Sequence, residues 1–152
     1  MSRGLLAIEM VRNALGYASL FRALYFAKRS NARRARAEFQ TALARLRTAP
    51  DFADAFDARI SMLEGFGDEA RRKLQRSMEK LQPRLDVNGR YITLYCQHFL
   101  DLYERSSQAR VSKSEASSLS PSGYLVHFLP FFADESISRI INEKGAKLDL
   151  KS

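Results

Sequence analysis

Residues 31–50 read NARRARAEFQTALARLRTAP, and the apolar side chains of this stretch decide how the rest of the chain is interpreted. Five arginines stand here against a single glutamate. The apolar residues recur at steps of three and four, which places them on one side of a helix: Ala35, Phe39, Ala42, Leu43 and Leu46. The arginines flank this stripe on both sides and form no separate ridge. The pattern predicts a helix with one buried face and leaves open what its basic flanks bind.

Similar stripes run through the first 105 residues and predict four more helices. The first stripe runs from Ala7 to Tyr25, and the others occupy 52–63, 70–81 and roughly 86–105. Breaks fall between them at Ser30–Asn31, Thr48–Asp51, Gly65–Asp68 and Pro83. We expect Thr48 to cap the third helix and Asp68 to cap the fourth, because short polar side chains accept hydrogen bonds from free backbone N–H groups.

The helices match one another at an offset of 35 residues. The stripe of the second helix recurs in the fourth as Ala70, Leu74, Ser77, Met78 and Leu81. Tyr17, Phe21 and Tyr25 of the first helix recur as Phe52, Phe56 and Ile60, and again as Val87, Tyr91 and Tyr95. A period of this length over both kinds of helix is typical of an array of helix-turn-helix repeats.

The stretch APDFADAFDARISMLEGFGDEARRKLQRSMEKLQP, residues 49–83, resembles a tetratricopeptide repeat. Phe56 stands at the first large aromatic position of that family, Gly67 to Ala70 at its turn, and Pro83 near its terminal proline. The resemblance covers residues 5–105 as about two and a half degenerate repeats, with Arg59 at a position where the family has leucine. It implies an all-α, right-handed stack of antiparallel helix pairs, a tetratricopeptide-like α-solenoid.

In tetratricopeptide proteins the first helix of each pair lines a groove that receives a peptide. The resemblance therefore implies that this chain is a non-catalytic protein–protein interaction module, an adaptor, chaperone-like protein or regulatory scaffold. The positions of the implied partner-binding groove are Arg22, Phe26, Arg29, Asp57, Ser61, Glu64, Cys96 and Phe99.

Composition sets the remaining expectations. A chain of 152 residues suits a single domain, 1–152, made of the repeats, a serine-rich loop over 106–123, and a C-terminal cap with a short helix over 124–145. The single Cys96 excludes an internal disulfide and favours a cytoplasmic location. Charged residues at Glu9, Arg12 and Arg22 interrupt the apolar N-terminal segment, so we expect neither a signal peptide nor a membrane span.

No pattern of residues predicts catalysis, a cofactor or a metal site. Cys96 and His98 are two residues apart, so they point to different sides of a helix. Two histidines and one cysteine provide no metal-ligand spacing. We therefore expect no enzyme, no metal and no cofactor.

Two alternatives to peptide binding remain. The net charge of +8 suits an anionic partner such as a nucleic acid, bound through Arg33, Arg34, Arg36, Arg45, Arg71, Arg72, Lys73 and Lys80. Aromatic residues do not interleave with these cations in the sequence, which speaks against a stacking platform for single strands. The second alternative is a structural homodimer through the apolar run Tyr124–Phe132, which otherwise serves as the cap.

Overall fold

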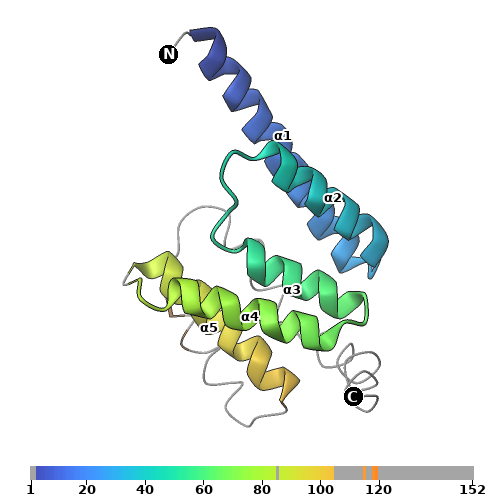
Figure 1. The fold of residues 1–152 in the computed structure, drawn as a ribbon, viewed down its shortest axis with the longest axis vertical. Coiled ribbons are helices and arrows are strands. Elements are labelled where there is room, and N and C mark those ends of the chain that lie inside the picture. The colour runs from blue at the N-terminus through green and yellow to red at the C-terminus, as the bar shows by residue number, and fades with distance from the viewer. Residues whose placement is uncertain (1–2, 85, 105–114, 116–117, 120–152) are drawn as a thin grey trace. The chain divides into compact units, whose positions relative to one another are not determined.

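The computed structural model describes residues 3–84, 86–104, 115, 118 and 119. These residues form five helices and no strand (Figure 1): α1 (Arg3–Lys28), α2 (Ala32–Arg45), α3 (Ala53–Leu63), α4 (Gly67–Leu81) and α5 (Val87–Tyr103). The predicted all-α class is confirmed for this part of the chain. The predicted loop over 106–123, apart from three isolated positions, and the predicted cap over 124–145 lie outside the described residues. None of the described helices has the length and apolarity needed to cross a membrane.

The chain divides into two compact units, Met1–Pro50 and Asp51–Ser152. In the first unit α1 and α2 pack against each other as a helical hairpin. In the second unit α3 packs against α4, and α4 packs against α5. A single domain over residues 1–152 stays a prediction.

The turn between α1 and α2 forms at the predicted break. Ser30 adopts a positive φ of 58°, and the backbone N–H of Asn31 donates to the Phe26 carbonyl at 2.9 Å, which closes the end of α1. The Asn31 side chain then caps α2 by accepting a hydrogen bond from the Arg34 backbone N–H at 3.2 Å. The positive φ of Ser30 and the side-chain cap of Asn31 therefore place the turn between α1 and α2 where the sequence predicts it.

The predicted helix caps at Thr48 and Asp68 are wrong. α3 begins only at Ala53, and the carboxylate of Asp51 accepts a hydrogen bond from Arg84 at 2.7 Å instead of capping a helix. α4 begins at Gly67, so Asp68 lies inside the first turn, where a negative charge is still favourable beside the helix dipole. Gly65 has a φ of 89° and ends α3 as predicted.

The buried positions of α2 and α4 share the 35-residue offset. The buried residues Ala35, Phe39, Ala42 and Leu46 of the first unit recur as the buried residues Ala70, Leu74, Ser77 and Leu81 of the second. The odd-numbered helices agree only in part: Phe56 and Ile60 of α3 match the buried Tyr91 and Tyr95 of α5, whereas Val87, at the position of the buried Phe52, is exposed. Arg59 lies in the core at 1% exposure, at the position where the resemblance expects leucine.

The prediction for the buried face of the first helix is wrong, because Leu24 is the only residue of the predicted apolar stripe that is buried. The buried residues of α1 begin at Gly16 and end at Ala27. Met10 and Val11, which belong to the same predicted stripe, are 71% and 57% exposed. The buried face of α1 is instead the side that carries Gly16, Leu20, Ala23 and Ala27, and this side packs against α2.

Candidate interaction surface

The predicted groove residues divide between the two units. Arg22, Phe26 and Arg29 lie on α1, Asp57, Ser61 and Glu64 lie on or beside α3, and Cys96 and Phe99 lie on α5. Arg22 and Arg29 are exposed and Phe26 is half-buried. Ser61, Cys96 and Phe99 are each 1% exposed, so a partner cannot touch them in this conformation. Only the α1 part of the predicted groove presents a cationic and aromatic surface.

The acidic part of the predicted groove is already bound by a lysine of the same unit. The Lys73 ammonium on α4 donates to the Asp57 carboxylate at 2.9 Å and to the Ser61 hydroxyl at 2.7 Å (both on α3). All three side chains are buried or half-buried. Lys73 belongs to the predicted anionic-partner patch, so one residue of that patch and two residues of the predicted groove hold α3 and α4 together.

The predicted anionic-partner patch also splits. In the second unit Arg72 pairs with Glu69 at 2.7 Å, and Lys80 pairs with Asp54 at 3.0 Å. The Arg72 guanidinium lowers the pKa of the Glu69 carboxyl. Three of the four predicted cations of the second unit therefore have carboxylate partners, while Arg71 is exposed.

The first unit carries the whole net charge of the protein. Residues 1–50 contain ten basic and only two acidic side chains, a balance of +8, whereas residues 51–152 contain fifteen of each. Both carboxylates of the first unit are engaged: Glu38 with Arg22 at 3.2 Å and Glu9 with Arg47 at 3.3 Å. Two carboxylates cannot balance ten basic side chains, so most of the positive charge of the α1–α2 hairpin is uncompensated. This excess of positive charge attracts anions to the hairpin.

A cluster of arginines and aromatic rings lies beside the turn of this hairpin; we call Tyr25, Phe26, Arg29 and Arg34 the turn cluster. The Arg29 guanidinium lies 4.5 Å from the centre of the Tyr25 ring, and the Arg34 guanidinium lies 5.3 Å from that of Phe26. The two rings meet edge-on with centroids 5.4 Å apart. These are the distances of cation–π and T-shaped aromatic contacts.

Aromatic residues do not interleave with the patch cations in the sequence, but the folded hairpin places the Phe26 ring beside one of them, Arg34. Phe26 is one helical turn before the break at Ser30, and Arg34 is one turn after it. Because the chain reverses at the break, residues at similar distances on its two sides become neighbours. The equal spacing of Phe26 and Arg34 from the predicted break at Ser30 is the sequence feature from which this contact could have been predicted.

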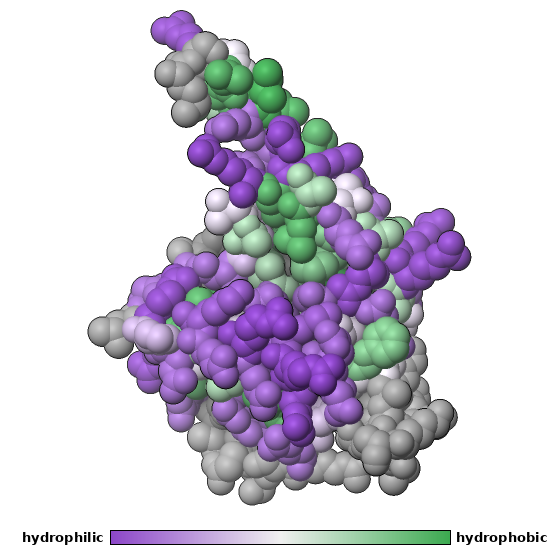
Figure 2. Space-filling model, in the orientation of Figure 1, coloured by the Kyte–Doolittle hydropathy of each residue, from purple (hydrophilic) through white to green (hydrophobic). Residues whose placement is uncertain are grey.

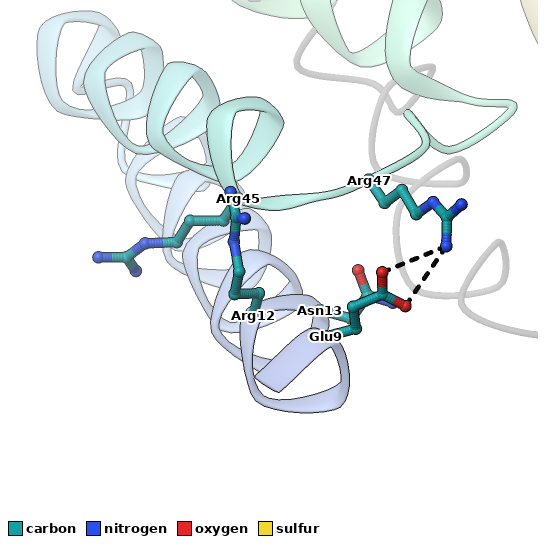
Figure 3. A pocket seen from close by; sticks show the side chains of 5 residues that line it. All are labelled: Glu9, Arg12, Asn13, Arg45 and Arg47. Atoms are coloured by element: carbon teal, nitrogen blue, oxygen red, sulfur yellow. Dashed lines mark hydrogen bonds and ion pairs between the residues drawn. The ribbon is translucent and has the colours of Figure 1, made fainter. Parts of the chain in front are cut away.

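A second cationic feature lies away from the turn, where α2 ends; we call Glu9, Arg12, Asn13, Arg45 and Arg47 the arginine notch. These residues line a hollow of about 260 Å³. Figure 3 shows the Arg47 guanidinium turned toward the Glu9 carboxylate, and the Arg45 side chain directed away from it. Arg45 donates to the buried Ser19 hydroxyl at 3.1 Å. With three guanidinium groups and one carboxylate, the notch keeps an excess of positive charge.

The described residues of the second unit offer no comparable feature. A hollow lined by Arg84 and Arg90 holds its main cation between two carboxylates, since Arg84 donates to Asp86 and to Asp51. Burial raises the pKa of the Cys96 thiol to about 12, so Cys96 is not a thiolate near neutral pH. Within the residues that the structure describes, no group of His, Cys, Asp and Glu is arranged to hold a metal ion.

The α1–α2 hairpin thus differs from the described part of the second unit by its two cationic features, the turn cluster and the arginine notch. No family model, no curated protein and no solved structure matches this chain.

Proposed function

We propose that this chain is a non-catalytic interaction module, an adaptor or regulatory scaffold, that binds an acidic segment of a partner protein through the turn cluster. The observation that carries the proposal is the exposed pairing of Arg29 and Arg34 with two aromatic rings. Tyrosine and arginine are the residues most enriched among those that dominate binding energy at protein interfaces. Tyr25 is 50% exposed, so its ring is available for an apolar contact beside the two charges.

The excess charge of the first unit supplies the specificity for an acidic partner. Both carboxylates of this unit are bound by Arg22 and Arg47, so neither neutralises the turn cluster. A partner segment that carries carboxylates beside an aromatic or aliphatic side chain matches both parts of the cluster. Charge complementarity of this kind accelerates association and rejects basic competitors.

The test compares two variants that each remove two positive charges. Arg29→Gln with Arg34→Gln removes the charges of the turn cluster, whereas Arg71→Gln with Arg76→Gln removes two exposed charges of α4. We expect an affinity pull-down from nuclease-treated extract to lose at least one protein partner only with the turn-cluster variant. Identical sets of partners for the wild type and both variants contradict the proposal.

Nucleic-acid binding is the second candidate, because stacked aromatics and arginines also suit single strands. The two candidates differ in their response to salt. Binding through several phosphates weakens by orders of magnitude between about 50 and 200 mM salt, whereas binding of an acidic peptide with an apolar anchor weakens less. Tight, steeply salt-dependent gel shifts of an oligonucleotide, lost in the turn-cluster variant, favour the nucleic acid.

We also propose that the helix pairs form a tetratricopeptide-like right-handed stack. The equal offset of the buried residues on α2 and α4 supports this arrangement. Spin labels at Thr41 and Arg76, exposed positions separated by the same 35 residues, test it. A stack predicts one narrow distance distribution between the labels, and a broad distribution contradicts it.

A further inference from the structure

The first half of α1 exposes large apolar side chains that no described element covers. Six of them are exposed: Leu5, Leu6, Ile8, Met10, Val11 and Leu15. Figure 2 shows this apolar surface on the N-terminal half of α1. A contiguous group of exposed large apolar side chains on a folded protein marks a site that contacts another molecule or a membrane.

Five of these six residues, from Leu6 to Leu15, form the apolar side of an amphipathic helix segment. At 100° per residue, the apolar side chains from Leu6 to Leu15 occupy an arc of about 200°. Glu9, Arg12 and Asn13 lie in the remaining sector. The same sector of the second half of α1 carries Leu20 and Ala23, which pack against α2. The apolar arc of the first half therefore faces away from the α2 side.

The polar sector of this segment opens into the arginine notch. Glu9, Arg12 and Asn13 come from α1, and Arg45 and Arg47 come from the end of α2 and the residues after it. Glu9 is held by Arg47, and no described carboxylate lies within ion-pairing distance of Arg12.

Charge decides between the possible occupants of the apolar arc. A second copy of this chain would bring another unit with a balance of +8 against the first, which opposes association. An anionic bilayer attracts Lys and Arg side chains near its surface, and it also accepts the apolar side chains. A wide apolar arc beside arginines is the pattern of helices that lie in the membrane interface.

We propose that the protein docks on anionic lipid bilayers through the first half of α1. The apolar arc lies at the boundary between headgroups and acyl chains, and Arg12, which lies beside the Ile8 edge of the arc, reaches the lipid phosphates. The surface lies at the other end of α1 from the turn cluster, so this proposal does not depend on the proposed function. It makes the chain a peripheral membrane protein.

The test is co-sedimentation of the full chain with vesicles. Vesicles of phosphatidylcholine with roughly 30% phosphatidylglycerol provide the anionic surface, and phosphatidylcholine alone provides the neutral one. We expect the wild type to bind the anionic vesicles and to bind the neutral vesicles at least about tenfold more weakly. Raising the salt concentration should weaken the anionic binding.

Two pairs of matched variants locate the site. Val11→Gln changes an exposed residue of the apolar arc, and Val87→Gln changes a valine of α5 that is 47% exposed. Arg12→Gln removes a charge of the notch, and Arg76→Gln removes one from the exposed side of α4. We expect Val11→Gln and Arg12→Gln each to weaken anionic binding severalfold, and the two controls to leave it close to the wild-type value.

Three results overturn the proposal. One is equal vesicle binding by Val11→Gln and Val87→Gln. Another is equal binding of the wild type to neutral and anionic vesicles. The third is a wild-type dimer in lipid-free sedimentation that Val11→Gln converts to a monomer, because the apolar arc is then the contact between two copies. Circular dichroism of each variant confirms that the helices are retained.

Discussion

Gly65 shows how a single residue sets a helix end. Its φ of 89° lies in the left-handed region, where a β-carbon meets the adjacent carbonyl oxygen. The space around it is open, so a substitution there affects the backbone conformation alone. A substitution at Gly65 therefore measures the energy of backbone strain without a contribution from side-chain packing.

We predict that Gly65→Ala lowers the free energy of unfolding by about 1 kcal/mol, because alanine is strained at positive φ. Urea denaturation followed by circular dichroism measures the change. Gly4→Ala is the control, since Gly4 is an exposed residue of α1 and alanine favours helices there. A Gly65→Ala variant as stable as the wild type contradicts this account of the α3–α4 turn.

Asp86 is the titrating residue with the clearest structural cause. Arg84 donates to both of its oxygens, at 2.7 and 2.6 Å, and lowers the pKa of this carboxyl from 3.8 to about 2. Asp86 also caps α5 by accepting a hydrogen bond from the Gly89 backbone N–H. The folded state therefore favours the ionised form, and its stabilising effect is lost as pH falls from about 5 toward 2.

We predict that Asp86→Asn loses less stability than the wild type between about pH 6 and pH 3, because asparagine keeps the cap without titrating. Urea denaturation at the two pH values tests this. High salt should reduce the difference, since the pair is exposed. Identical pH dependence of the two proteins counts against the ion pair.

At the scale of elements, the contact between α3 and α4 depends on a polar side chain as well as on the apolar faces. Lys73 binds Asp57 and Ser61 across the two helices, and its side chain is only 14% exposed. Lys80 makes a similar pair with Asp54, but its side chain is 63% exposed. Water screens the second pair far more than the first.

We predict that Lys73→Met lowers the free energy of unfolding by about 2 kcal/mol, because it removes two hydrogen bonds to partly buried polar groups. The matched Lys80→Met should cost less than about 1 kcal/mol, as exposed ion pairs do. Thermal and urea denaturation measure both values. If Lys73→Met is harmless to stability but reduces binding of an anion, Lys73 belongs to a binding site instead.

At the scale of the whole molecule, charge is divided very unevenly between the two units. Residues 1–50 have a net charge of +8, so their basic side chains repel one another, while residues 51–152 are neutral overall. Self-repulsion destabilises a compact state, and salt screens it.

We predict that raising sodium chloride from about 20 to 300 mM slows amide hydrogen exchange more in α1 and α2 than in α3, α4 and α5. Exchange measured by mass spectrometry resolves the two units. Arg33→Gln with Arg34→Gln should shrink the salt effect in the hairpin. Equal protection of all five helices by salt argues against charge repulsion within the first unit.

The sequence by itself determined the all-α class, the positions of the helices and the turn at Ser30, because spacing and capping are local properties. It predicted the buried face of α2 for the same reason, except that Leu43 of the predicted stripe is 37% exposed. It did not predict that the carboxylates of Asp51 and Asp57 are bound by Arg84 and Lys73 from distant parts of the chain.

Only the tertiary structure decided which apolar and charged faces remain available. A stripe such as that of α1 records which side of a helix is apolar, but it does not record which side packs against a neighbour. Met10 is exposed because it lies on the side of α1 that faces away from α2, and Arg34 meets Phe26 because the chain reverses between them. The interaction surfaces follow from these long-range placements, which no local pattern encodes.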